Sequence, residues 1–253
     1  MILNLLTICA LIGPLNTAWW AEDAAVSSTP VDLMTSLAAY WEMEETGTRT
    51  DSRNDYDLLE FNGSSTRSED QMLGSYAVLF SGDGEALGTN NAIFSASNQW
   101  PFTVNFWYKR NGADTANQFV MGMWDSNNWD SSAWYVSVDA APRAIFNIVN
   151  GTGGTVSWSN NATLGANYTM VTVTWDDAAF TSTVYVNAAP ATSEMEDMYN
   201  GGGGKFTMGS DSAYQFAYGS FLIDSVAYWT NRILSAIEVT NLYNGGSGRT
   251  YPF

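Results

Sequence analysis

The sequence predicts an all-β fold, an antiparallel two-sheet sandwich with one short C-terminal helix and an extended N-terminal arm. Short runs in which apolar and polar residues alternate recur along the chain, and this alternation is typical of strands with one buried face. The 22 glycines, with frequent Asn and Ser, indicate many tight turns. Because the runs follow one another too closely for crossover helices, the strands should pair antiparallel.

The clearest strand pair lies in the second half of the chain. Residues 169–175 alternate, with Val171 and Val173 on one face, and residues 183–187 alternate again after a turn-like segment. These two runs predict a β-hairpin. The remaining runs that predict strands are residues 77–80, 102–108, 118–123, 134–138, 144–149 and 219–229.

One helix is expected near the C-terminus. Ser235 and Glu238 have the spacing of a capping box, in which each side chain bonds the backbone N–H of the other residue. Ile237, Leu242 and Tyr243 are expected on the buried side of this helix, and Gly245 should end it.

The first 32 residues lack the short alternating runs of the rest of the chain. They predict an arm, with the sandwich over residues 33–253. Residues 2–15 are mostly apolar but shorter than the roughly 20 residues of a membrane-spanning helix. A secretory signal begins with basic residues, whereas the first one here is Arg49; a retained arm is therefore favoured over a cleaved signal. Since exposed apolar surface marks contact with a partner, we expect the arm to bind another protein subunit, a capsid or tail protein or a second copy. The candidate contact residues are Ile2, Leu5, Leu6, Trp19 and Trp20.

Composition argues against several function classes. With 26 acidic and 9 basic residues, the formal charge is −17, which disfavours nucleic acid as a partner. The chain has no histidine, so the most frequent general base is missing. Cys9 is the single cysteine and cannot form an intrachain disulfide.

Several segments, in this order, resemble the laminin-G-like jelly-roll modules of the concanavalin A-like lectin/glucanase superfamily. The end is the most specific part, where residues 219–229 and 232–246 resemble the closing strand and the capped helix of the family. The other matching segments are residues 37–52, 77–87, 102–108, 168–175 and 185–187. Ser225 stands where the family often has an acidic residue, and Asn187-Ala188 stands where it often has Asp-Gly.

The resemblance implies calcium as a cofactor, because members of this superfamily often hold an ion at the rim of the sandwich. It places Asp83 and Asp224 at such positions, where carboxylate oxygen suits a hard cation. The alternative is that Asp83 supports a glycine-rich turn and that Asp224 binds backbone N–H groups.

Catalysis is not expected. Glucanases of this fold need two carboxylates beside the cleaved bond, presented as Glu-x-Asp-x-x-Glu from one strand, and this spacing is absent. The nearest acidic cluster, Glu42, Glu44 and Glu45, is expected on a solvated strand.

A tryptophan- and asparagine-rich segment is the candidate glycan site. Flat aromatic faces and short polar side chains are the mixture that sugar sites use. The candidates are Trp124, Asp125, Asn127, Asn128, Trp129 and Asp130. The alternative is a core or subunit-contact role, which is favoured for Trp134 and is equally plausible for Trp129.

Together these features predict a non-catalytic module for surface recognition or coating. A virion structural protein, such as a phage decoration, fibre or tail component that binds a host-surface glycan, fits the arm. A secreted or cell-surface bacterial carbohydrate-binding module is the alternative, and a glycan hydrolase is the third reading. The expected location is the virion surface or the extracellular medium, with no transmembrane span.

Overall fold

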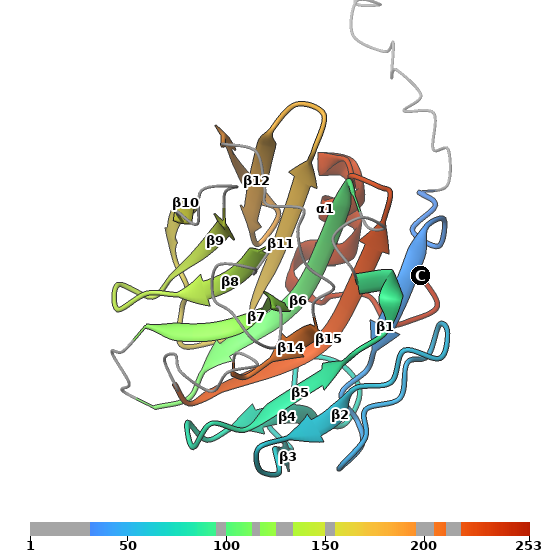
Figure 1. Ribbon diagram of the computed structural model, residues 1–253, viewed down its shortest axis with the longest axis vertical. Coiled ribbons are helices and arrows are strands. Elements are labelled where there is room, and N and C mark those ends of the chain that lie inside the picture. The colour runs from blue at the N-terminus through green and yellow to red at the C-terminus, as the bar shows by residue number, and fades with distance from the viewer. Residues whose placement is uncertain are drawn as a thin grey trace, which may run out of the picture. The chain divides into compact units, whose positions relative to one another are not determined.

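The computed structural model describes residues 31–94, 100–112, 117–124, 134–149, 155–195, 205–210 and 219–253. Asp32–Phe253 forms one compact unit, built mostly of strands in two antiparallel sheets with one α-helix (Figure 1). The predicted fold class is therefore confirmed. Apart from its last two residues, the predicted arm lies outside the described residues. Among the described residues, no helix is long and apolar enough to cross a membrane.

The eight-stranded sheet is organised around its longest strand, β15 (Phe221–Thr230). This strand pairs with β6 (Phe102–Arg110) on one side and with β4 (Ala77–Phe80) and β1 (Leu37–Trp41) on the other. Beyond β6 the sheet continues through β11 (Thr169–Asp176), β12 (Thr181–Val186) and β13 (Ala189–Glu194), and beyond β4 it ends at β3 (Thr66–Ser68). The predicted hairpin is confirmed as β11 and β12.

The seven-stranded sheet runs from one long polar edge strand to one short edge strand. Its order is β10 (Thr155–Thr163), β9 (Arg143–Val149), β8 (Trp134–Val138), β7 (Gln118–Trp124), β14 (Lys205–Met208), β5 (Ala86–Thr89) and β2 (Leu59–Phe61). Each of these pairs is antiparallel.

An aromatic cluster fills the space between the two sheets. Trp134 of the seven-stranded sheet stacks on Phe102 of the eight-stranded sheet with ring centroids 4.8 Å apart, and Tyr228, on the same sheet as Phe102, lies 5.8 Å from it. Trp134 is fully buried, so its role in the core is confirmed. Because neighbouring residues of a strand point to opposite faces, each core position leaves its neighbours facing outward.

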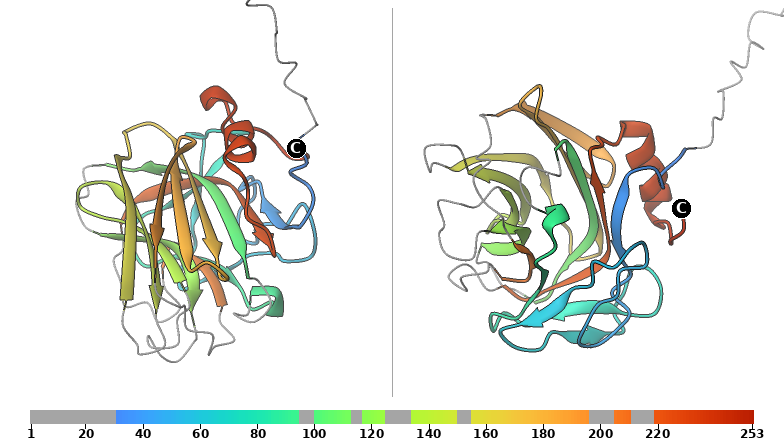
Figure 2. Two further views of the ribbon diagram at one scale, coloured as in Figure 1. Left: turned by 90° about the horizontal axis from the view of Figure 1, so that it is seen from above. Right: turned by 45° about the vertical axis from the view of Figure 1, so that its right-hand side comes forward.

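The outer face of the eight-stranded sheet is covered by α1 (Ala236–Tyr243) and the chain after it (Figure 2). The Trp107 ring stacks on Tyr243 at 6.1 Å, and the Trp229 ring lies 6.1 Å from Phe253. Two short 3₁₀ helices, η1 (Ala92–Phe94) and η4 (Asn244–Gly246), complete the described elements. The outer face of the seven-stranded sheet, in contrast, carries no α-helix from the described residues.

The helix begins as the sequence predicts but buries a different side. Ser235 and Glu238 form both bonds of the capping box, and Asn244 closes the C-terminus in the left-handed conformation. The prediction that Ile237 is buried is wrong, because this side chain is 70% exposed. Val239 and Leu242 face the sheet instead. They are three residues apart, which places them on one helical face, whereas Ile237 points elsewhere.

Candidate functional site

A single row of residues crosses the outer face of the seven-stranded sheet. The strand register places one residue of each strand beside the next, in the order Leu59, Gly88, Thr207, Gly122, Tyr135, Asn147 and Ser157. We call this set the outer row. Phe206 and Met208, the chain neighbours of Thr207, belong to the core, so the outer row faces away from it.

The middle of the outer row is made of glycine. A Cβ on Gly122 would lie 2.6 Å from the carbonyl oxygen of Trp134, and one on Gly88 would lie 2.6 Å from that of Phe206. The Phe61 ring also lies against Gly88, since its Cε2 would be 2.9 Å from such a Cβ. No larger side chain fits at either position without movement of the backbone. Thr207 lies between these two glycines, and we call Gly88, Thr207 and Gly122 the glycine floor.

Thr207 carries a hydroxyl whose hydrogen bonds are not satisfied. The residue is 1% exposed, and its buried Oγ1 has no hydrogen-bond partner among the described residues. Leaving a buried hydroxyl unpaired costs about 1–3 kcal/mol. Buried polar groups in proteins are nearly always paired with protein, water or ligand, so this hydroxyl is a candidate for contact with a bound molecule.

Asn147 fixes the polar end of the outer row. Its Nδ2 donates to Ser137 Oγ at 3.0 Å, and its Oδ1 accepts from Ser157 Oγ at 2.6 Å. Three adjacent strands are thereby linked through their outward side chains. The Asn147 amide is committed to this network, so it supports the face, while the hydroxyl groups of the exposed edge strand β10 remain at the surface.

Aromatic side chains stand on both sides of the glycine floor. Tyr135 stacks on Phe119 with ring centroids 6.0 Å apart and an angle of 26°. Burial raises the pKa of Tyr135, and a hydrogen bond with Thr155 partly offsets this rise. Across the floor, Lys205 Nζ lies over the Phe61 ring, 5.1 Å from its centroid.

The charge on this face contrasts with the charge of the whole chain. None of the outer-row residues is acidic, although the chain carries a formal charge of −17. Lys205, which pairs with Trp124 on β7, forms no ion pair within the described ranges. At the end of the sheet, Arg143 is paired with Asp139 at 2.5 Å.

The predicted glycan segment begins at the edge of this face. Trp124 ends β7, and its backbone pairs with Lys205. Asp125, Asn127, Asn128, Trp129 and Asp130 lie outside the described residues, as do Ile2, Leu5, Leu6, Trp19 and Trp20 of the arm. These assignments stay predictions.

The predicted metal ligand Asp224 is a backbone anchor in this structure. Its Oδ2 accepts the N–H of Met72 at 2.7 Å and that of Leu73 at 2.9 Å, and its Oδ1 accepts from Ser225 Oγ at 3.1 Å. The side chain is fully buried. This is the arrangement that the sequence offered as the alternative to a calcium ligand.

The structure does not bring Asp83 and Asp224 together. Phe80 pairs with Phe221, so Asp83 lies beyond one end of this ladder and Asp224 lies beyond the other. Asp83 accepts from Ser81 Oγ at 3.1 Å. In the described part of the chain, no group of three acidic or cysteine side chains could hold a metal.

The acidic cluster Glu42, Glu44 and Glu45 follows β1, which ends at Trp41, so the prediction that it lies on a strand is wrong. Glu44 also serves the backbone. Its Oε1 accepts the N–H of Ser75 at 2.8 Å and that of Tyr76 at 3.4 Å. A cavity of about 70 Å³ beside it is lined by residues that include Tyr40, Glu42 and Ser225. The arrangement holds the loop before β4 in place.

The two antiparallel sheets and the terminal helix define a lectin-like jelly-roll domain. Residues 81–240 match the family model of the concanavalin A-like lectin/glucanases superfamily, which is more than half of the chain. The chain therefore belongs to this superfamily, as its sequence features indicated.

Solved structures with this fold include receptor-binding domains of toxins. The receptor-binding domain of botulinum neurotoxin type G has a TM-score of 0.62 and 16% identity, over 84% of this chain and 52% of that chain. The binding domain of Paraclostridial Mosquitocidal Protein 1 has a TM-score of 0.63 and 15% identity, over 83% and 52%.

A structure of botulinum neurotoxin type C, whose cell entry depends on interaction with two ganglioside molecules, has a TM-score of 0.63 and 14% identity, over 83% of this chain and 51% of that chain. The chain thus spans about half the length of these structures. At such identity the likeness shows the fold alone. No curated protein sequence matches the chain.

Proposed function

We propose that this chain is a non-catalytic carbohydrate-recognition module that binds glycan on the outer face of the seven-stranded sheet. The observation that carries the proposal is the outer row, in which hydroxyl groups and a tyrosine ring stand on a glycine floor without any carboxylate. Sugar sites combine aromatic faces with a few oriented polar groups, and this face offers both.

The superfamily contains both lectins and glucanases, so membership is compatible with glycan binding and with glycan hydrolysis. Glycoside hydrolysis requires two carboxyl groups about 5–9.5 Å apart beside the cleaved bond, and the outer row offers none. Recognition needs only the polar and aromatic groups that the face has. The toxin receptor-binding domains of the same fold, among them that of a toxin that interacts with gangliosides, also favour recognition.

The test is the binding of immobilised oligosaccharides to the full chain and to Tyr135→Ala. Loss of the exposed part of this ring should weaken binding by about 3- to 10-fold. Phe180→Ala is the matched control, because Phe180 is also an exposed aromatic residue, 41% accessible, but lies in the turn of the opposite sheet. An equal loss in both variants, or no binding by the unmodified chain, contradicts the proposal.

We further propose that the module is displayed on a larger assembly and that residues 1–32 attach it there. A virion is the assembly that we favour, and the cell surface or extracellular medium is the alternative. Support comes from the apolar residues of the arm, Ile2, Leu5, Leu6, Trp19 and Trp20, because such residues gather at contacts with partners.

Deletion of residues 2–30 tests this attachment. The compact unit Asp32–Phe253 should stay folded and monomeric, whereas assembly with the partner subunit should be lost. Size-exclusion chromatography with light scattering measures the first, and co-purification with particles measures the second. Normal incorporation of the truncated chain into particles would remove the support for a role of the arm.

A further inference from the structure

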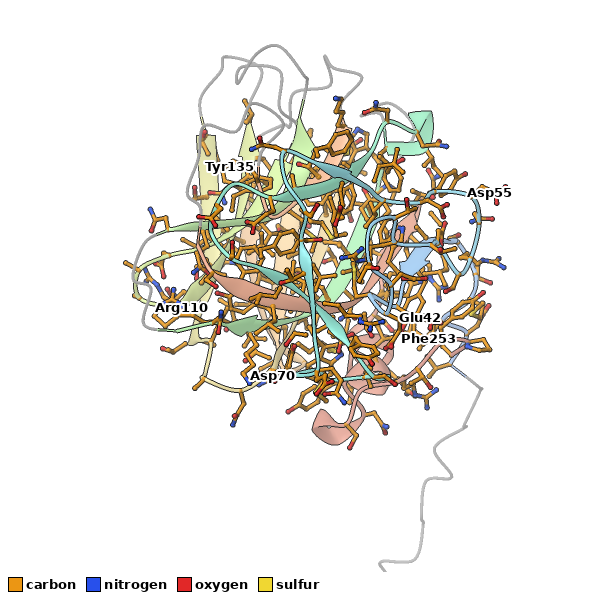
Figure 3. All side chains as sticks on the ribbon, turned by 90° about the horizontal axis from the view of Figure 1, so that it is seen from below. Glu42, Asp55, Asp70, Arg110, Tyr135 and Phe253 are labelled. Carbon is orange, nitrogen blue, oxygen red and sulfur yellow. The ribbon has the colours of Figure 1, made fainter. Side chains whose placement is uncertain are left out.

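Lys205 forms no ion pair with the described residues of this strongly acidic chain. The three ion pairs of the described residues engage Lys109, Arg143 and Arg232, while Lys205 Nζ rests over the Phe61 ring. In Figure 3, the labelled acidic residues Glu42, Asp55 and Asp70 lie apart from Tyr135. A cation that no carboxylate neutralises is a partner for an anionic group that contacts it directly, even though the net charge of the chain disfavours anions at longer range.

Thr207 lies two residues after Lys205 on the same face of β14. Its buried hydroxyl lacks a partner among the described residues, and the glycines on both sides leave no side chain to provide one. The unsatisfied hydroxyl is an observation independent of the charge on Lys205. Both indicate a ligand with oxygen atoms, one of them in an anionic group.

We propose that the glycine floor, together with Lys205, Thr207 and the two flanking rings, is a subsite for an acidic sugar. Lys205 pairs with the carboxylate or sulfate of the sugar, Thr207 binds a hydroxyl or ring oxygen, and Phe61 and Tyr135 enclose the ring. This inference rests on the proposed function and adds the class of ligand to it.

Contact with the Thr207 hydroxyl requires the side chains above it to move, because Thr207 is 1% exposed. Phe61 lies against Gly88 and Lys205 lies over Phe61, so we assign this movement to these two half-buried side chains. The charge of Lys205 then moves from the face of an aromatic ring to an anionic oxygen, which is the stronger partner.

The experiment is a calorimetric titration of the full chain with three oligosaccharides of equal length: a neutral glucan, an oligomer of uronic acid and a sulfated glucan. Lys205→Met keeps the length of the side chain and removes its charge, and it should weaken binding of the acidic oligosaccharides by about tenfold or more while sparing the neutral one. Lys109→Met is the matched control, because Lys109 pairs with Asp70 on the other sheet.

Thr207→Val gives a second, independent measurement. It removes the hydroxyl at nearly constant volume, so binding should fall several-fold while the melting temperature stays the same or rises, since an unsatisfied buried hydroxyl is lost. A structural role for this hydroxyl would instead lower the melting temperature and leave affinity unchanged, and that result overturns its place in the subsite.

The outcomes separate the two proposals. Preference for either acidic oligosaccharide that is lost in Lys205→Met supports the subsite, and the tighter of the two identifies the anionic group. Equal binding of neutral and acidic oligosaccharides, unchanged in Lys205→Met, overturns the subsite and leaves carbohydrate recognition standing. Absence of binding to every oligosaccharide in the Tyr135 experiment and in this one overturns both.

Discussion

Asp224 and Leu73 are 151 residues apart in sequence and are joined by a hydrogen bond of 2.9 Å from the Leu73 N–H to the Asp224 carboxylate. Burial raises the pKa of Asp224 to about 6, and the hydrogen bonds from Leu73 and Met72 offset only part of this rise. Glu44 contributes a further increase through like charge. This anchor therefore consists of a carboxylate that is costly to ionise.

The raised pKa of Asp224 predicts that the stability from this group falls as pH rises. The folded chain binds this proton more tightly than the unfolded chain, so the stabilisation is complete below the unfolded pKa of 3.8 and is lost as pH rises through about 6. A shift of this size corresponds to roughly 3 kcal/mol in total, of which about 2 kcal/mol is lost between pH 4 and pH 7. Urea denaturation across this range measures it.

Asp224→Asn keeps an oxygen acceptor for the two N–H groups and removes the titration. The difference in unfolding free energy between the variant and the unmodified chain should therefore grow in favour of the variant from pH 4 to pH 7. Asp224→Ala is the control, because it lacks the acceptor and should lose about 1–3 kcal/mol. A difference that does not vary with pH would disprove the assignment.

Calcium binding stays a prediction. Because Asp83 and Asp224 lie apart, a variant of each residue can test the site separately. The Asp224 oxygens accept backbone N–H groups, whereas Asp83 and Glu85 lie in one turn and both accept from Ser81. Calcium should raise the melting temperature by an amount set by the ratio of free calcium to its dissociation constant. Asp83→Asn should abolish this rise and Asp224→Asn should retain it. An unchanged melting temperature in chelator argues against any calcium site.

Alternation in the sequence located several of the strands, including β11, which is buried on both faces. Residues 77–80 and 134–138 were predicted with the bounds that β4 and β8 have in the structure. The sequence did not reveal β2, β3, β5, β10, β13 or β14. Four of these, β2, β3, β5 and β14, have only three or four residues, and β10 and β13 are polar or exposed strands without a buried apolar face. Pairing with neighbours on both sides stabilises β5 and β14, and propensity alone does not report such pairing.

The outer row could not be predicted for a different physical reason. Thr207 and Gly122 are neighbours only because β14 pairs with β7 in one register, and register depends on the fold of the whole sheet. The chain around each residue reads as an ordinary short strand. The tryptophan-rich segment that did stand out in the sequence begins at Trp124, directly beside Lys205 in the ladder.

The turn between β12 and β13 is formed by a residue pair that is strained at its second position. Asn187 has a φ of 51° and Ala188 a φ of 66°, and β12 and β13 pair on both sides of these two residues. Two positive φ values define a type I′ turn, which favours Asn-Gly. The tight turn is therefore present although Asn187-Ala188 stands where the family often has Asp-Gly.

Ala188→Gly should stabilise the chain by about 0.5–1 kcal/mol, because glycine adopts a positive φ without the steric penalty of a Cβ. Urea denaturation measures the gain. Asn187→Ala is the opposing control: asparagine tolerates this conformation, and its Oδ1 accepts the Met170 N–H at 3.0 Å, so its loss should destabilise. A loss of stability in Ala188→Gly would show that the turn is not strained.

The terminal helix gives the last prediction, since the sequence and the structure assign its buried face differently. Leu242 is 3% exposed and Ile237 is 70% exposed. Leu242→Ala should therefore reduce the free energy of unfolding by about 2–5 kcal/mol through lost burial and a cavity. Ile237→Lys should change it by no more than about 0.5 kcal/mol, as is usual for exposed positions.

Ser235→Ala gives a reference value for the loss of stability in this helix. The Ser235 hydroxyl accepts the Glu238 N–H at 3.3 Å, and loss of such a cap costs about 1 kcal/mol. The three variants should rank Leu242→Ala, Ser235→Ala and Ile237→Lys from the largest loss to the smallest. Urea denaturation of each, with helix content followed by circular dichroism, gives the ranking. A loss in Ile237→Lys as large as that in Leu242→Ala would mean that Ile237 is covered in solution, by the sheet or by a partner on the exposed side of α1.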